Sequence, residues 1–248
     1  MNLIPPYFWV LGILFVSTLT HSVLGFGNAL IAMPLLAMVV GIKTATPLVA
    51  AVLMTVALTI ALRNWRIIEW RSTWRLVMSS LLGIPLGLLL LKGVSEAFMR
   101  AFLGVIVILF SLYNLVKPNL KITRDHVGLA YLVGFLAGVL GGAYNTSGPP
   151  IVIYSTLRRW SPGRFLATIQ SYFWFTGILI LIGHGVAGLW NSYVFRLYGI
   201  SLPVVFVAIF LGGSLNRSIP RKQFNRYVNV ALVLIGLLLL ALQSQVWE

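Results

Sequence analysis

The chain has 248 residues, of which 59% are hydrophobic and only 9% are charged. Soluble domains carry roughly 25% charged residues, so this composition excludes a soluble globular protein and predicts an all-α protein that crosses a membrane several times. The net charge of +14 indicates basic cytoplasmic loops rather than a partner nucleic acid. Cysteine is absent, which excludes disulfides and thiol chemistry.

Long apolar segments follow one another along the chain, and most are long enough to cross the ~30 Å hydrocarbon core of a bilayer. In chain order they span residues 6–24, 28–42, 44–62, 73–91, 98–116, 127–143, 148–157, 165–183, 194–214 and 227–242. Segments 28–42 and 148–157 are short, and each begins directly after a glycine-containing interruption. We therefore expect two broken or re-entrant helical hairpins. The sequence leaves open whether their short arms cross the membrane fully.

Lysine and arginine are distributed unevenly between the two predicted sides of the membrane. If the loop after segment 44–62 is cytoplasmic, that side holds 14 of the 18 basic residues, and the other side holds Lys43, Lys92, Arg100 and Arg196. Basic residues accumulate in cytoplasmic loops. The distribution therefore predicts that both termini lie on the non-cytoplasmic side.

A weak internal repeat divides the segments into two groups of five. Gly25 and Gly141 are 116 residues apart, as are Pro34 and Pro150. An odd number of segments per half would give the halves opposite orientations, and inverted repeats with broken helices and a midplane site are a common plan of secondary transporters. Chance similarity between leucine- and glycine-rich segments is the alternative. The predicted parts are a first repeat over residues 1–116, a cytoplasmic linker over 117–126 and a second repeat over 127–248.

The carboxylates of the chain limit the chemistry that its membrane segments can carry out. The acidic residues are Glu69, Glu96, Asp125 and Glu248, and all lie in predicted loops or at the terminus. A carboxylate within the membrane is the usual partner of Na⁺, of a cationic substrate or of a relayed proton. Its absence from the predicted spans favours an anionic or neutral substrate and disfavours acid–base catalysis.

The two interruptions are the candidate substrate site. Helix amino termini expose unpaired N–H groups and a partial positive charge, and in inverted repeats the helices that start near Asn28 and Gly148 would converge on one site. The alternative is that these residues only cap helix ends and allow close packing. The predicted substrate-binding residues are His21, Ser22, Gly25, Gly27, Asn28, Asn145, Thr146, Ser147, Gly148 and Gln170.

Three basic side chains near the interruptions are further candidates. His21 is the one histidine inside a predicted span, so it is a candidate for substrate binding or proton coupling, or for a neutral hydrogen bond between helices. Lys43 and Arg164 open the helices that follow the short segments. They are candidates for attracting an anion at the two mouths, or for anchoring helix ends. Scattered histidines without cysteine or acidic neighbours predict no metal site, and no cofactor is expected.

Two motifs resemble the TauE/SafE family of sulfite and organosulfonate transporters. They are LGFGNALIAMPL at residues 24–35 and GGAYNTSGPPI at residues 141–151. The resemblance implies transport of a small sulfur-containing or related organic anion across the cytoplasmic (inner) membrane of a prokaryote. Export is the favoured direction, and alternating access around a midplane site is the expected mechanism.

Other classes of function remain open on the sequence alone. A passive anion channel would share most of these features. A membrane-embedded enzyme with His21 as base lacks an acidic partner, a metal set and a nucleophile motif, and a scaffold subunit fits poorly with the short loops. The expected partners are a small anion and membrane lipid. Substrate identity, coupling ion and assembly into a homo-oligomer are not determined by the sequence.

Overall fold

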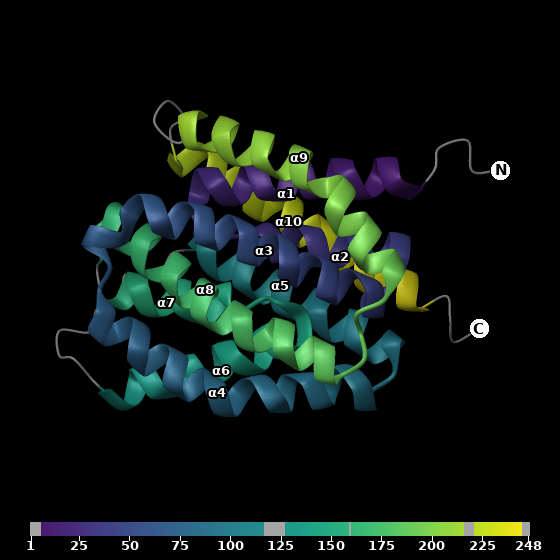
Figure 1. Cartoon of the computed structure of the whole chain (residues 1–248), viewed down its shortest axis with the longest axis horizontal. Coiled ribbons are helices and arrows are strands. Elements are labelled where there is room, and N and C mark those ends of the chain that lie inside the picture. Colours follow the sequence, from purple (N-terminus) through teal and green to yellow (C-terminus); the bar gives the residue numbers. More distant parts are fainter. Residues whose placement is uncertain (1–5, 117–126, 159, 216–220, 245–248) are drawn as a thin grey trace. The chain divides into compact units, whose positions relative to one another are not determined.

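The computed structural model describes residues 6–116, 127–158, 160–215 and 221–244, and within these ranges the regular structure is helical without any strand. The predicted linker, residues 117–126, lies outside the described residues. The elements are α1 Pro6–Leu24, α2 Asn28–Val40, α3 Ile42–Asn64, the 3₁₀ helix η1 Trp65–Ile67, α4 Trp70–Gly93, α5 Glu96–Val116, α6 Val127–Tyr144, α7 Gly148–Leu157, α8 Pro162–Val186, α9 Ser192–Leu215 and α10 Arg221–Ser244 (Figure 1).

Seven helices in the described part of the chain are long and apolar enough to cross a membrane. They are α1, α3, α4, α5, α6, α8 and α9. Helix α2 is apolar but has only 13 residues, and α7 has 10, so both are shorter than the roughly 20 residues of a full span. The prediction of an all-α protein with several membrane segments is confirmed.

The helices form two compact units, and each unit draws on both halves of the sequence. Unit 1 comprises Met1–Ala45, Gly93–Asn119 and Gly199–Glu248, and unit 2 comprises Thr46–Lys92 and Leu120–Tyr198. The helices α1, α2, α5 and α10 thus belong to unit 1, and α4, α6, α7 and α8 belong to unit 2. Helices α3 and α9 each contribute residues to both.

The order of helix lengths recurs along the chain. Helix α2 starts at Asn28 and α7 at Gly148, and the next helices start at Ile42 and Pro162, so both pairs are 120 residues apart. This recurrence is what two five-helix halves would produce. This spacing of 120 residues exceeds the 116 residues between Gly25 and Gly141 by about one helical turn. The reason is that α6 continues past Gly141 to Tyr144. The opposite orientation of the halves and the proposed repeat boundaries stay predictions.

Glycines bring α4 and α6 of unit 2 into close contact. A methyl group added at Gly83 or Gly87 would collide with the backbone of α6. One added at Gly138 or Gly142 would collide with the backbone of α4. Residues four apart lie on one helix face, and small residues at such positions allow membrane helices to approach closely. The glycines therefore fix α6, and the break that follows it, against α4.

Unit 1 is held by the pairing of α5 with α10 and by the packing of α2 on both. A methyl group added at Gly236 of α10 would meet Ile108 and the carbonyl of Gly104 on α5. Glycine at position 236 therefore permits this close helix pair. The short helix α2 is buried along most of its length, so the break that precedes it lies inside unit 1.

Candidate functional site

The first break joins α1 to α2 in three residues, 25–27, within unit 1. Gly25 has φ 87° and Gly27 has φ 103°, and this left-handed region is open to glycine at little steric cost. The N–H of Gly25 donates to the carbonyl of His21 at 2.6 Å, which closes the last turn of α1. The two glycines thus allow the chain to leave one helix and start the next almost at once.

The start of α2 offers backbone donors in a buried position. The N–H of Ile31 donates to the carbonyl of Gly27 at 3.2 Å, so the N–H groups of the three preceding helical residues have no acceptor inside the helix. The N-cap, Gly27, makes no side-chain capping bond. Asn28, Ala29 and Leu30 are all buried. Free N–H groups and the positive end of a helix dipole suit the oxygens of an anion.

The side chain of Asn28 lies at the same helix start and is incompletely hydrogen-bonded. It is 0% exposed, and its Nδ2 donates to Oγ1 of Thr18 at 3.0 Å. Its Oδ1 has no partner within the described part of the chain, although buried polar atoms usually have one. A half-turn of the carboxamide would let it accept from Thr18 and would turn its NH₂ group toward a ligand.

His21 and Ser22 precede the break by one turn of α1. Both are buried, and the hydroxyl of Ser22 donates to the carbonyl of Thr18 at 2.8 Å. The predicted residues at the α1–α2 break in unit 1 are thus His21, Ser22, Gly25, Gly27 and Asn28. Their roles in substrate binding and proton coupling stay predictions.

Helix α5 adds two buried polar residues that sequence reasoning missed. The ring of Phe26 in the break makes an edge-to-face contact with Phe110, with ring centroids 5.9 Å apart. Ser111 and Asn114 follow Phe110 in α5, and Oγ of Ser111 and Nδ2 of Asn114 are buried without a hydrogen-bond partner in the described ranges. Polar residues in an otherwise apolar span are the signal that could have identified them.

The second break joins α6 to α7 through residues 145–147, within unit 2. Asn145 has φ 58°, and asparagine is among the few residues that adopt this conformation. Its N–H donates to the carbonyl of Gly141 at 2.8 Å, and the N–H of Thr146 donates to that of Leu140 at 3.2 Å. The bond from Asn145 to Gly141 is that of the αL motif, which ends many helices. The Nδ2 of Asn145 also donates to the carbonyl of Thr46 at 2.7 Å.

The two helix starts are unequal as anion sites. Helix α7 begins Gly148-Pro149-Pro150, and proline has no N–H. Of the three donors that a first helical turn normally exposes, α7 therefore retains only that of Gly148, whereas α2 retains all three. Helix α2 therefore offers an anion more free backbone donors than α7 does.

Side-chain hydroxyls surround the second break. Thr146 and Ser147 are buried, and Ser147 neighbours the hydroxyl of Tyr172 on α8. The same Tyr172 hydroxyl lies 2.7 Å from Oγ of Ser80 on α4, and Ser80 lies 2.6 Å from the carbonyl of Gly134 on α6. The break is thus held to a hydrogen-bonded network between α4, α6 and α8.

The remaining predicted residues lie at different depths. Gln170 is buried in α8, whereas Lys43 and Arg164 are exposed near the starts of α3 and α8. Gln170 and the second break belong to unit 2, and the first break and Lys43 belong to unit 1. The convergence of both breaks on one substrate site stays a prediction.

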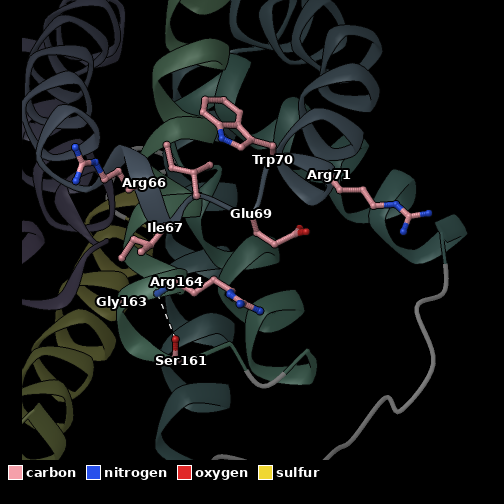
Figure 2. Close-up of a pocket in the computed structure, with 9 residues that line it drawn as sticks. Arg66, Ile67, Glu69, Trp70, Arg71, Ser161, Gly163 and Arg164 are labelled. Carbon is pink, nitrogen blue, oxygen red and sulfur yellow. Dashed lines mark hydrogen bonds between the residues drawn. The ribbon is translucent and has the colours of Figure 1, made fainter.

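A cavity of about 630 Å³ lies in unit 2 between η1, the residues that follow it and the start of α8. Figure 2 shows Arg66 and Arg71 on opposite sides of it, with the side chain of Arg164 between them in this view. The charged, hydroxyl and aromatic side chains that line it are those of Arg66, Glu69, Trp70, Arg71, Ser161 and Arg164. Sequence reasoning identified Arg164 as a mouth residue and did not find the cavity.

These helices and their buried polar breaks define a multi-pass membrane protein with polar sites inside its units. Comparison with known families identifies it further. Residues 10–239 match the sulfite exporter TauE/SafE family, so the chain belongs to that family of membrane transporters, as the motif resemblance predicted.

Two curated relatives cover most of the chain. One is the probable sulfite/organosulfonate exporter TauE of Cupriavidus necator, 24% identical over 219 residues, which are 85% of this chain and 84% of the relative. The other is the probable inner membrane transporter protein TsaS of Comamonas testosteroni, 24% identical over 187 residues, which are 75% of this chain and 77% of the relative. No solved structure matches the chain.

Proposed function

We propose that this protein is a secondary transporter that exports a small sulfur-containing or organic anion across the inner membrane of a prokaryote, with both termini on the non-cytoplasmic side. The name of the Cupriavidus necator relative, a probable sulfite/organosulfonate exporter, supports this substrate class and direction. The name of the Comamonas testosteroni relative supports transport at the inner membrane. The sequence also places no carboxylate within a predicted span, and such a carboxylate would repel an anion. Sulfite and organosulfonates such as sulfoacetate are the first substrates to test.

The observation that carries the proposal is the buried start of α2. Three backbone N–H groups that lack acceptors inside the helix lie there beside the Asn28 carboxamide, whose Oδ1 is unpaired among the described residues. The oxygens of a sulfite or sulfonate group would accept hydrogen bonds from these donors, as oxyanions do at other helix amino termini. Burial excludes competing water and strengthens each of these interactions.

In this proposal the second break has a different part in transport. The Asn145 side chain already donates to Thr46, and α7 keeps few free backbone donors. The hydroxyls of Thr146 and Ser147, with Gly148 and Gln170, would then contribute polar contacts to the solute. Convergence of both breaks on the same bound anion would allow alternating access around one site. Non-additive loss of affinity in Asn28→Ala combined with Thr146→Ala would support that arrangement.

Transport by the purified protein in lipid vesicles tests the proposal. The panel comprises sulfite, sulfoacetate, taurine, sulfolactate and simple carboxylates. Asn28→Asp should lower transport at least about tenfold, because a carboxylate at the start of α2 would repel the anion. Asn191→Asp is the matched control, since Asn191 accepts from the N–H of Val194 at the start of α9 and aspartate caps helices equally well.

Two results would overturn the proposal. One is a wild-type protein that transports no anion of the panel. The other is an Asn28→Asp variant that reaches the membrane and transports like the wild type. Accumulation against the solute gradient in response to an imposed proton gradient separates coupled transport from passive flux. Loss of that response in His21→Gln would assign the coupling role to His21.

A further inference from the structure

The cavity in unit 2 has an excess of positive charge. We call it the arginine cavity, and its charged lining consists of Arg66, Arg71, Arg164 and Glu69 (Figure 2). All three arginines are exposed, so their guanidinium groups are accessible to a solute. Arginine presents several N–H donors in a planar arrangement that matches oxyanions.

The single carboxylate of the cavity is already engaged by the backbone. Oε2 of Glu69 accepts from the N–H of Ser72 at 2.8 Å and so caps the first turn of α4. Among the described residues, no ion pair joins Glu69 to Arg66, Arg71 or Arg164. The carboxylate thus reduces the positive charge of the cavity without cancelling it.

The start of α8 contributes to the same cavity. Ser161 is the N-cap of this 25-residue helix and accepts from the N–H of Arg164. Ser161, Gly163 and Arg164 all line the cavity. The positive end of the α8 dipole therefore adds to the charge of the three arginines.

A face of buried polar side chains continues from the cavity along α8. Oγ1 of Thr168 accepts from the N–H of Glu69 at 3.1 Å. One turn further, Oγ of Ser171 lies 3.4 Å from Oγ1 of Thr73 on α4. Both α8 residues are buried. Such polar groups join membrane helices to one another, and they also offer hydrogen bonds along a route that is otherwise apolar.

The same face reaches the second break. Tyr172 follows Ser171, and its buried hydroxyl lies 2.7 Å from Oγ of Ser80 and next to Ser147. Ser147 is the last residue before α7. A series of polar contacts thus connects the arginine cavity to the break within a single unit.

We propose that the arginine cavity captures the oxyanion group of the transported solute and that the polar face of α8 leads it to the second break. The proposal rests on the function proposed above, because the ligand is the same small anion. Its chemistry is that of a sulfite, sulfonate or phosphate group, each of which arginine binds through paired hydrogen bonds. A positively charged entrance also raises the rate at which anions arrive, and salt weakens this effect.

Transport kinetics of charge-removal variants test the capture role. Initial rates for radiolabelled sulfite are measured in vesicles sorted for orientation, with the arginine-rich face exposed, over a range of KCl concentrations. Arg66→Gln combined with Arg164→Gln should raise KM about fivefold at low salt, leave Vmax within about twofold and flatten the salt dependence. Arg63→Gln removes a charge from the last turn of α3, outside the cavity, and should behave like the wild type.

An unchanged KM and an unchanged salt dependence in the double variant would overturn the proposal. A second arm compares vesicles of neutral lipid with vesicles that contain phosphatidylglycerol. A difference between variant and wild type that appears only with phosphatidylglycerol would assign the cavity to a lipid phosphate and would also overturn it. The same difference in both lipids supports capture of the soluble anion.

Equilibrium binding separates this proposal from the transport function. Radiolabelled sulfite is titrated onto the purified protein, with Asn28→Asp and the arginine double variant measured alongside the wild type. Suppose that a binding component is lost in the arginine double variant and kept in Asn28→Asp. This result supports anion capture by the arginine cavity, even if the wild type transports no anion of the panel. Equal binding by the double variant and the wild type counts against it, whatever the transport assays show.

Discussion

The side chain of Asn145 donates a hydrogen bond of 2.7 Å to the backbone carbonyl of Thr46, 99 residues away in sequence. Asn145 also has the left-handed backbone conformation that ends α6, with φ 58°. One residue therefore both turns the chain at the break and tethers the break to α3 within unit 2. These two tasks can be separated by substitution.

We predict that Asn145→Ala destabilises the protein more than Asn145→Gly does. Both variants lose the bond to Thr46, which costs about 1 kcal/mol. Alanine also pays about 1 kcal/mol for the left-handed conformation, which glycine adopts freely. Thermal unfolding in detergent measures the order of the two variants. Equal stabilities would show that the backbone conformation of residue 145 does not contribute.

The backbone at Gly27 allows a similar test in unit 1. Its φ is 103°, and a methyl group added there would have no atom within 4 Å. Gly27→Ala should therefore cost about 1–2 kcal/mol through backbone strain alone, and it should lower transport because α2 starts at the next residue. Gly12→Ala is the control, since it also adds a methyl group in open space but lies within α1, where alanine favours the helix. Opposite signs of the two changes in unfolding temperature are expected.

Apolar segment length was enough to predict the helices, and the residual errors lie at their ends. The segment 148–157 has the bounds of α7, but α8 starts at Pro162 rather than at residue 165. Ser161 caps that helix, and proline is well suited to its first turn. Polar capping residues thus extend a helix beyond the apolar stretch that marks it.

The equivalent positions of the two breaks were harder to find. Glycine is the usual residue at a left-handed helix end, and the equal spacing of glycines and prolines paired Gly25 with Gly141. In the second half Asn145 occupies that conformation instead. Pairing between distant segments, such as Asn145 with Thr46, depends on the tertiary fold and has no local sequence signal. The same holds for the division into two units, the arginine cavity and the packing of α4 on α6.

The contact between α4 and α6 predicts strong sensitivity at Gly138. A Cβ at this position would lie 2.7 Å from the carbonyl oxygen of Ser80, so Gly138→Ala must push two backbones apart. Overpacking of this kind costs about 1–3 kcal/mol. Gly128→Ala is the matched control on the same helix, because its added methyl group meets nothing within 4 Å. Unfolding in detergent should show a clear loss of stability for Gly138→Ala and little change for Gly128→Ala.

The hydroxyls of Ser80 and Tyr172 should be energetically coupled. They lie 2.7 Å apart, and the Ser80 oxygen also lies 2.6 Å from the carbonyl of Gly134. A serine hydroxyl has one proton, so donation to Gly134 leaves Ser80 to accept the proton of Tyr172. A double-mutant cycle with Ser80→Ala and Tyr172→Phe should give a coupling of about 0.6–1.7 kcal/mol, as for other hydrogen bonds between membrane helices.

Ser79 provides the control for that cycle. Its hydroxyl donates to the carbonyls of Arg75 and Leu76 within α4, so Ser79→Ala combined with Tyr172→Phe should be additive. Tyr172→Phe should also slow transport if the polar face of α8 carries the solute, because it removes the hydroxyl next to Ser147. Equal coupling energies in the Ser80 and Ser79 cycles would mean that the lost stability reflects a general weakening of the packing of α4. The contact between Ser80 and Tyr172 would then have no specific role in holding the second break.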